Sequence, residues 1–233
     1  MAASDSIPLA EIAADLRGPR FRAELRTSWA IAVLYRLPAV PAVWAAARLG
    51  LSPTQVTYLA LLLALTMPLQ ALFLPLGLAS VCVALSGIVF QILDCVDGTL
   101  ARITRRSSRR GADLDFLTDM AQWALLYLAI GLLADRTLGG SWGWAALAAG
   151  AAWVRLYARV IRDRLAEPEQ APPAPVPIRA AQWPVVFVTG LSGLIPFLAL
   201  AGGGLWLAVL FLLAYAVLDL LDAALPLFAA DRA

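Results

Sequence analysis

Long apolar stretches dominate this chain of 233 residues and restrict the folds that it can adopt. A helix needs roughly 20 mainly apolar residues to cross the hydrocarbon core of a bilayer. Stretches of about this length cover residues 51–73, 78–103, 113–134, 142–162, 183–201 and 204–227. The overall composition agrees, since 61% of the residues are hydrophobic and 15% are charged. The sequence therefore predicts an all-α integral membrane bundle of six transmembrane helices.

The residues before the first apolar stretch have a different character. Residues 1–14 lack the basic start and compact apolar core of a signal peptide, so we interpret them as a tail. Residues 15–50 mix six arginines with apolar and aromatic residues, and Pro38 and Pro41 interrupt them. This segment is too charged to span a membrane, and we expect an amphipathic interfacial helix there. A six-span domain over 51–228 follows, with a Pro-rich linker at 165–179.

The distribution of arginine predicts the orientation in the membrane. The N-terminal region and the links at 104–112 and 162–181 hold nearly all of the arginines, whereas the links near 75, 137 and 202 hold almost none. Loops rich in Lys and Arg stay in the cytoplasm. Both termini are thus expected on the cytoplasmic side, in a bacterial inner membrane. The net charge of +2 is too small to indicate binding to nucleic acid.

Acidic residues gather where two of the apolar stretches meet. Asp94 and Asp97 share one helical face with two small residues, and Asp115 and Asp119 share a face of the next helix. Carboxylate oxygens are the ligands that hard divalent cations prefer. The chain has no His, and its two cysteines fall within apolar helix, so carboxylates are its main candidates for metal ligands. Four carboxylates close to hydrocarbon indicate a functional site, because placing them there is costly.

At these residues the sequence resembles the CDP-alcohol phosphatidyltransferase (CDP-alcohol phosphotransferase) family. The family signature is D-x2-D-G-x2-A-R-x8-G-x3-D-x3-D, and residues 94–119 meet all of its fixed positions. The resemblance implies a membrane transferase of phospholipid biosynthesis. Such an enzyme moves a phosphatidyl or phospho-alcohol group from a CDP-linked lipid donor to an alcohol and releases CMP. It also implies two divalent ions, Mg²⁺ or Mn²⁺, and a homodimer.

The resemblance also implies roles for individual residues. The principal metal ligands would be Asp94, Asp97 and Asp115, and Asp119 would be the general base and a possible fourth ligand. The residues implied in binding the donor are Gly98, Ala101, Arg102, Ser108 and Gly111, together with Pro53, Thr54 and Thr57 at the start of the first span. For the last three residues a second interpretation stays open, because Ser52 and Pro53 also make a good helix start.

The acceptor alcohol stays undetermined at this point. Arg155 and Arg159 lie four residues apart near the expected cytoplasmic end of a span, where they can hold a phosphorylated alcohol such as glycerol phosphate or inositol phosphate. Equally, both can extend to anionic lipid headgroups. A different function, a small transporter that couples cations or protons through intramembrane carboxylates, is the alternative. The sequence shows no inverted repeat, and its carboxylates cluster at one face of the membrane, which favours the enzyme.

Overall fold

The computed structural model of the chain describes residues 8–18, 21, 24–25, 28–165, 187–188 and 190–230. Over these ranges every regular element is a helix, which confirms the predicted all-α class. The predicted Pro-rich linker lies outside the described residues except at its first position, and so does the beginning of the predicted span 183–201.

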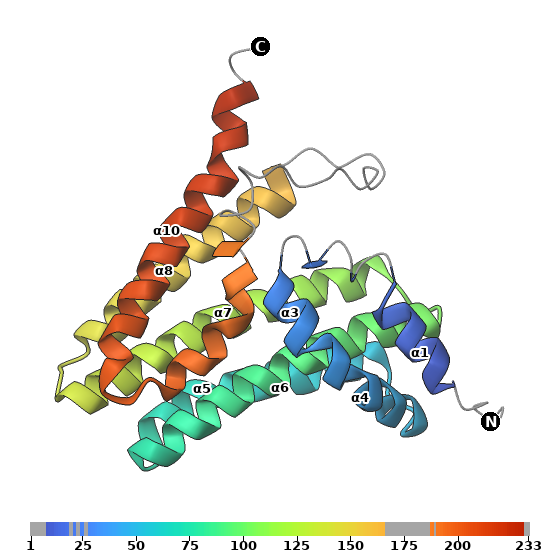
Figure 1. Ribbon diagram of the computed structural model, residues 1–233, viewed down its shortest axis with the longest axis horizontal. Coiled ribbons are helices and arrows are strands. Elements are labelled where there is room, and N and C mark those ends of the chain that lie inside the picture. Colours follow the sequence, from blue (N-terminus) through green and yellow to red (C-terminus); the bar gives the residue numbers. More distant parts are fainter. Residues whose placement is uncertain are drawn as a thin grey trace. The chain divides into compact units, whose positions relative to one another are not determined.

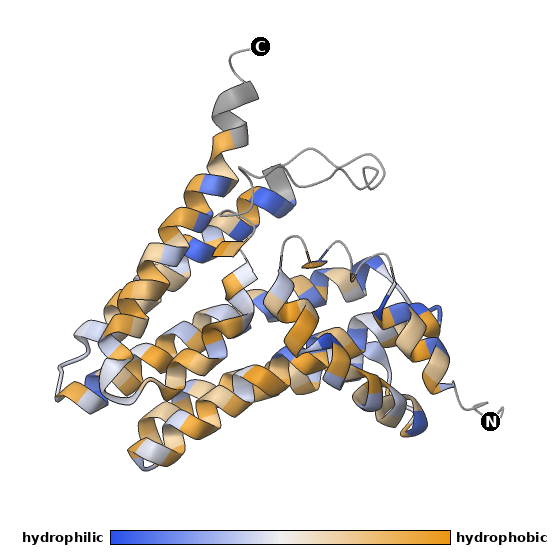
Figure 2. Ribbon diagram, in the orientation of Figure 1, coloured by the Kyte–Doolittle hydropathy of each residue, from blue (hydrophilic) through white to orange (hydrophobic). Residues whose placement is uncertain are grey.

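Four helical stretches are long and apolar enough to cross a membrane. They are α5 (Pro53–Phe73), α6 (Leu76–Ile103), α7 (Arg109–Leu138) and Gly202–Leu225, which joins the short 3₁₀ helix η4 (Gly202–Gly204) to most of α10 (Leu205–Ala230). Figure 2 shows that apolar residues cover most of α5, α6 and α10. Leu62 and Leu69 on α5 are exposed, as expected for side chains that face lipid tails. These helices support the prediction of an integral membrane protein.

The other two predicted spans are helical but shorter. α8 (Gly143–Val160) corresponds to the prediction over 142–162 and ends in a π-helical turn, η1 (Ile161–Leu165). It falls outside the four candidate spans, as expected for an alanine-rich helix that carries Arg155 and Arg159. In the predicted span 183–201, most of the described part is a 3₁₀ helix, η3 (Leu191–Leu200). The prediction of six spans is therefore supported at four positions.

The chain divides into two compact units, and α5, α6 and α7 each contribute to both. The first unit comprises Met1–Thr66, Leu85–Gln122 and Ile178–Pro196, and the second comprises Met67–Ala84, Trp123–Pro177 and Phe197–Ala233. The predicted division into a tail, an interfacial segment and one membrane domain does not coincide with these units, and it stays a prediction.

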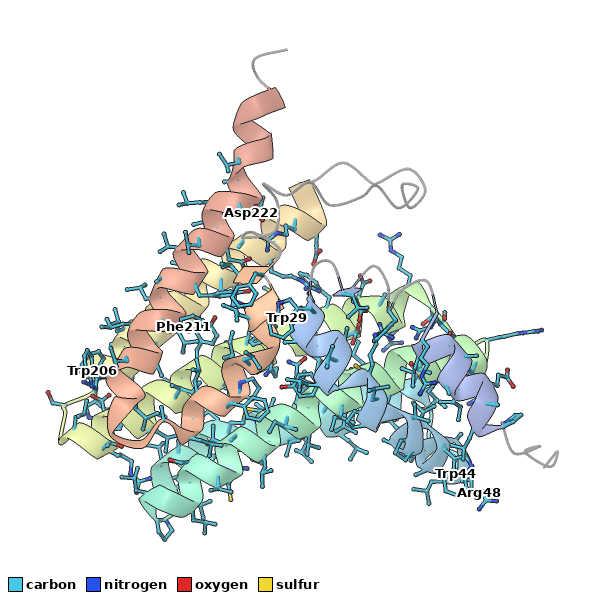
Figure 3. All side chains as sticks on the ribbon, in the orientation of Figure 1. Trp29, Trp44, Arg48, Trp206, Phe211 and Asp222 are labelled. Atoms are coloured by element: carbon cyan, nitrogen blue, oxygen red, sulfur yellow. The ribbon has the colours of Figure 1, made fainter. Side chains whose placement is uncertain are left out.

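Among the described residues, three short helices with given bounds occupy the N-terminal part of the first unit. They are α1 (Leu9–Leu16), α3 (Trp29–Leu34) and α4 (Arg36–Arg48), so residues 15–50 do not form one continuous helix. The predicted tail over 1–14 also ends in a helix, because α1 begins at Leu9. On α1, Ile12 and Leu16 lie one turn apart and are both buried. These two side chains join a core cluster with Val43 of α4 and Val96 of α6. On α4 the guanidinium of Arg48 lies 4.4 Å from the ring of Trp44 (Figure 3).

Contacts within the first unit connect α3 to the segment around Gly193. The buried hydroxyl of Tyr35 donates a hydrogen bond to the Gly193 carbonyl at 2.5 Å. Burial raises the pKa of this hydroxyl, which therefore stays protonated and able to donate at neutral pH. A Cβ at position 193 would lie 2.7 Å from the backbone nitrogen of Ile31, so only glycine permits this approach. Trp29 stacks on Phe187 with ring centroids 5.8 Å apart.

In the second unit, α8 and α10 lie side by side (Figure 1). Small buried residues on α8, such as Ala148 and Ala152, permit the close approach that is typical of membrane helices. Arg162 forms ion pairs with Asp219 at 2.8 Å and with Asp222 at 3.0 Å. These two aspartates therefore have a structural partner within the unit.

Candidate active site

The carboxylates of the signature come together in the first unit, where α6 ends and α7 begins. Asp94 and Asp97 lie in the last turns of α6, and Asp115 lies in the second turn of α7. One oxygen from each of these three side chains lies within 4.8 Å of the other two. Asp97 is 5% exposed, and Asp94 and Asp115 are half-buried. The structure thus gathers three of the four predicted metal ligands into one cluster.

The turn between the two helices explains how the carboxylates meet. The Arg106 N–H donates to the Ala101 carbonyl at 2.8 Å, and the Arg105 N–H donates to the Arg102 carbonyl at 3.1 Å. This pair of bonds is the Schellman motif that ends many helices, with Arg105 in the left-handed position that glycine usually takes. Only residues 104–108 separate α6 from α7. The short link brings the two acidic faces close together.

The carboxylate oxygens of the cluster and the distances between them suit a divalent cation. Ligand oxygens on opposite sides of one ion lie about 4.2 Å apart for Mg²⁺ and about 5 Å apart for Ca²⁺, from their usual bond lengths. The observed spread of 4.8 Å falls within this range. Without a cation, ionised carboxylates at such distances repel one another strongly in a buried site. A divalent cation held by carboxylate oxygens therefore fits the residues present.

Asp119 and Thr57 lie beside the cluster. Asp119 is half-buried one turn after Asp115, and its carboxyl is a hydrogen-bonding neighbour of Asp94. The buried hydroxyl of Thr57 donates to a carboxylate oxygen of Asp97 at 2.6 Å. Thr57 was predicted to contact the nucleotide, and in this structure it orients Asp97. The role of Asp119 as the general base stays a prediction.

A pocket of about 200 Å³ opens beside the carboxylates. Its volume far exceeds the roughly 10–15 Å³ that one buried water needs. The residues that line it come from the start of α5, the end of α6, the link and the start of α7, and they are Pro53, Thr54, Thr57, Asp97, Gly98, Ala101, Arg102, Arg106, Ser107, Ser108, Gly111, Ala112 and Asp115. Every donor-binding residue predicted from the signature and from the start of the first span thus lies on one pocket.

Both readings of the α5 start agree with the structure. Ser52 Oγ accepts a hydrogen bond from the Gln55 N–H at 3.2 Å, and Gln55 Oε1 accepts one from the Ser52 N–H at 2.8 Å. This reciprocal pair is a capping box, so the predicted helix start is confirmed. The two residues that follow Ser52 line the pocket.

Arg102 is held by an unexpected partner. Its Nε lies 3.1 Å from Asp15 Oδ2 and its Nη2 lies 2.7 Å from the same atom, so one edge of the guanidinium binds the carboxylate of α1. Its Nη1 lies 3.4 Å from the position that a Cβ at Gly98 would occupy. This distance is an ordinary van der Waals contact, so the guanidinium lies directly against Gly98 at the pocket wall.

The sequence matches one known protein family. The CDP-alcohol phosphatidyltransferase family matches residues 50–181, which is more than half of the chain. The chain belongs to the CDP-alcohol phosphatidyltransferase family. No curated protein matches the chain. Membership implies transfer of a phosphate-linked group from a CDP-alcohol to an alcohol acceptor, and the carboxylate cluster is consistent with the divalent metals that the family uses.

The two arginines predicted to hold the acceptor of this transferase lie in the second unit and do not line the pocket. The Arg155 guanidinium lies 4.2 Å from the centroid of the Trp123 ring and 4.9 Å from that of Tyr215. Arg159 forms an ion pair with Asp163 at 2.7 Å. Both arginines thus have partners within their own unit, and both interpretations of them stay predictions.

Sequence reasoning missed one contact and one helix cap of the transferase site. Asp15 holds Arg102 from a position 87 residues away, and no local pattern indicates such a contact. Ser108 was predicted to bind pyrophosphate, and its Oγ accepts a hydrogen bond from the Gly111 N–H at 3.0 Å, which caps α7. That cap was detectable, because serine just before a helix favours this role.

We predict that Arg102→Lys weakens donor binding by about 10–100-fold, the cost of one or two hydrogen bonds to a charged group. Lysine keeps the charge but cannot bind Asp15 along one edge and face the pocket with another nitrogen. The measurement is the KM for the CDP-linked donor. Arg110→Lys is the control, because Arg110 is exposed on α7 and lies outside the pocket. Equal losses in the two variants would contradict the assignment.

Proposed function

We propose that this protein transfers a phosphatidyl or phospho-alcohol group from a CDP-linked donor to an alcohol acceptor and releases CMP. CDP-diacylglycerol is the donor that we consider first. The observation that carries the proposal is the cluster of Asp94, Asp97 and Asp115, whose oxygens lie within 4.8 Å of one another beside a pocket. Family membership supports the same reaction class.

In this proposal Asp94, Asp97, Asp115 and Asp119 hold two divalent ions, Mg²⁺ or Mn²⁺. Bound ions would neutralise the donor pyrophosphate and the charge that develops on the departing CMP. The pocket residues bind the cytidine and phosphates: Gly98 and Ala101 let them lie against α6, and Arg102 pairs with a phosphate oxygen. Thr57 holds the Asp97 carboxylate in position through its 2.6 Å hydrogen bond.

The chemical step requires a base next to the acceptor. Asp119 accepts the proton of the acceptor hydroxyl, whose oxygen then forms a bond to the phosphorus of the transferred group. The bond between that phosphorus and the oxygen of CMP breaks, and CMP carries the electron pair away. The contact between Asp119 and Asp94 supports this role, because it would put the proposed base at the edge of the cluster.

The experiment that tests the proposed function is an acceptor panel. Purified protein with Mg²⁺ and labelled CDP-diacylglycerol is given serine, inositol, inositol phosphate or glycerol phosphate in turn. CDP-choline and CDP-ethanolamine are tested with diacylglycerol in parallel. We expect CMP release with one member of the panel, and a phosphorylated acceptor if Arg155 and Arg159 contribute to its site. Turnover with serine alone or CDP-choline alone would exclude that role of the arginines, and no turnover at all would contradict the proposal.

We place the enzyme in a bacterial inner membrane with both termini and the aspartates on the cytoplasmic side. The arginine-rich link between α6 and α7 supports this orientation. We retain six spans and an interfacial N-terminal region in the proposal. Labelling of cysteines introduced at Arg105 and Thr137 from opposite sides of the membrane would check the orientation.

A homodimer is also proposed, and native mass spectrometry from nanodiscs would measure its mass.

A further inference from the structure

Two buried polar side chains of the first unit take no part in the site described so far. Thr118 is 3% exposed and Gln122 is 0% exposed, and both lie on α7. Within the part of the chain that the structure describes, neither the Thr118 hydroxyl nor the Gln122 amide has a hydrogen-bond partner. Native proteins pair nearly all such groups, because burial without a partner is unfavourable. Three unpaired atoms on one helical turn therefore indicate that something else binds them.

The register of α7 places these side chains beside the carboxylates. Thr118 follows Asp115 by three residues, and Gln122 follows Asp119 by three and Asp115 by seven. Residues at these spacings share one face of a helix. With a rise of about 1.5 Å per residue, Gln122 lies about 10 Å further along the helix than Asp115. The same helical face thus carries pocket residues, then the carboxylates, then the unpaired amide.

This order along α7 matches what the proposed reaction requires. Gly111 and Asp115 line the pocket on one side of the cluster. In phosphoryl transfer the attacking and leaving oxygens lie roughly in line, on opposite sides of the phosphorus. If the donor nucleotide occupies the pocket, the attacking hydroxyl arrives from the other side. On α7, Thr118, Asp119 and Gln122 are the polar residues on that side of Asp115 before the helix becomes apolar.

The chemistry of the two side chains specifies the kind of group that they bind. A glutamine amide offers two N–H donors and an acceptor, and a threonine hydroxyl can donate and accept. Neither carries a charge, so they match a neutral hydroxyl better than a phosphate or a carboxylate. We propose that Gln122 and Thr118 bind an uncharged hydroxyl of the acceptor alcohol and orient it toward Asp119. This inference rests on the proposed function and names the acceptor side of the same site.

The test uses the full-length protein and the acceptor that gives the highest CMP release in the panel. Gln122→Leu and Thr118→Val remove the polar atoms with little change in volume. We expect the KM for the acceptor to rise about tenfold in each, the loss of roughly one hydrogen bond, while the KM for the CDP-linked donor stays constant. We also expect thermal unfolding without substrates to occur at the same or a higher temperature, because an unpaired buried polar group has been removed.

Matched variants separate binding from structure. Gln70→Leu makes the same substitution about 20 Å along α5 from the pocket residue Thr57, and should change neither KM. Thr118→Ser keeps a hydroxyl and should therefore keep the acceptor KM of the wild type, unlike Thr118→Val. Gln122→Met matches the length of glutamine and gives a second apolar variant if the leucine variant does not fold. A thermal shift caused by the acceptor alone should be smaller in Gln122→Leu and Thr118→Val than in the wild type.

The possible failures are distinguishable. If the wild type releases no CMP with any acceptor, the proposed function fails and this inference fails with it. If the wild type is active and both apolar variants keep the acceptor KM, the inference is overturned and a buried water occupies these groups. An equal rise of the donor and acceptor KM values would also overturn it, because that result would show a general disturbance of α7.

Discussion

Removal of divalent cations with a chelator is expected to abolish CMP release, a loss of more than about a thousandfold when ions supply several kcal/mol of transition-state stabilisation. The reason is the cluster of Asp94, Asp97 and Asp115, whose oxygens lie within 4.8 Å of one another and repel when ionised. Adding Mg²⁺ or Mn²⁺ should restore activity. Initial rates of CMP release, measured across a titration of each ion after chelation, provide the test.

A substitution in the cluster extends the same test to a single residue. Asp97→Asn should weaken binding of the metal and of the donor together, because an amide oxygen lacks the charge of the carboxylate that Thr57 now holds. Asp113→Asn is the matched control, since Asp113 is exposed on α7 and lies outside both the cluster and the pocket. Full activity in chelator without added metal would end the metal hypothesis.

The second large effect is expected from Asp119→Asn. The amide keeps the shape of the side chain but cannot accept the hydroxyl proton, so kcat should fall about 10²–10⁴-fold, the usual contribution of a general base. Donor binding should persist, because Asp119 lies outside the pocket lining and the cluster of Asp94, Asp97 and Asp115 is unchanged. Stopped-time assays for kcat and equilibrium binding of a CDP-linked donor measure the two quantities separately.

Two outcomes would redirect the interpretation. Near-normal CMP release by Asp119→Asn would show that another group, such as Asp115, accepts the proton. If substitutions at Asp94, Asp97, Asp115 and Asp119 all left lipid synthesis unchanged, a transporter that uses these carboxylates for cation or proton coupling would become the better explanation.

The site was predictable from the sequence where its residues are close along the chain. Asp94, Asp97 and Asp115 lie on two consecutive helices, so helical periodicity alone places them on facing sides of a short turn. The hydrogen bond from Thr57 to Asp97 crosses 40 residues, and the ion pair between Arg102 and Asp15 crosses 87. Contacts of that separation depend on how helices pack, which no local pattern encodes.

The fold was predictable to a similar degree. Length and hydropathy identified α5, α6, α7 and α10 as membrane helices. The same criteria do not establish α8, because alanine is only weakly apolar and two arginines lie near its end. The N-terminal segment was predicted as one interfacial helix, whereas the structure has separate helices. The burial of Ile12 and Leu16 against α4, α5 and α6 is a tertiary contact that composition could not reveal.

The short link between α6 and α7 has a mechanical consequence. Helix residues advance by about 100° each. The number of residues between Arg102 and Gly111 therefore affects how the acidic face of α7 is oriented relative to the acidic face of α6. One residue more or less within the first turn of α7 would turn Asp115 by about a quarter of a revolution relative to the start of that helix, away from Asp94 and Asp97. The unconventional Arg105 in its left-handed turn fixes that orientation at a cost of about 1–2 kcal/mol. The eight-residue spacing in the signature therefore keeps the acidic faces of α6 and α7 in a fixed orientation relative to each other.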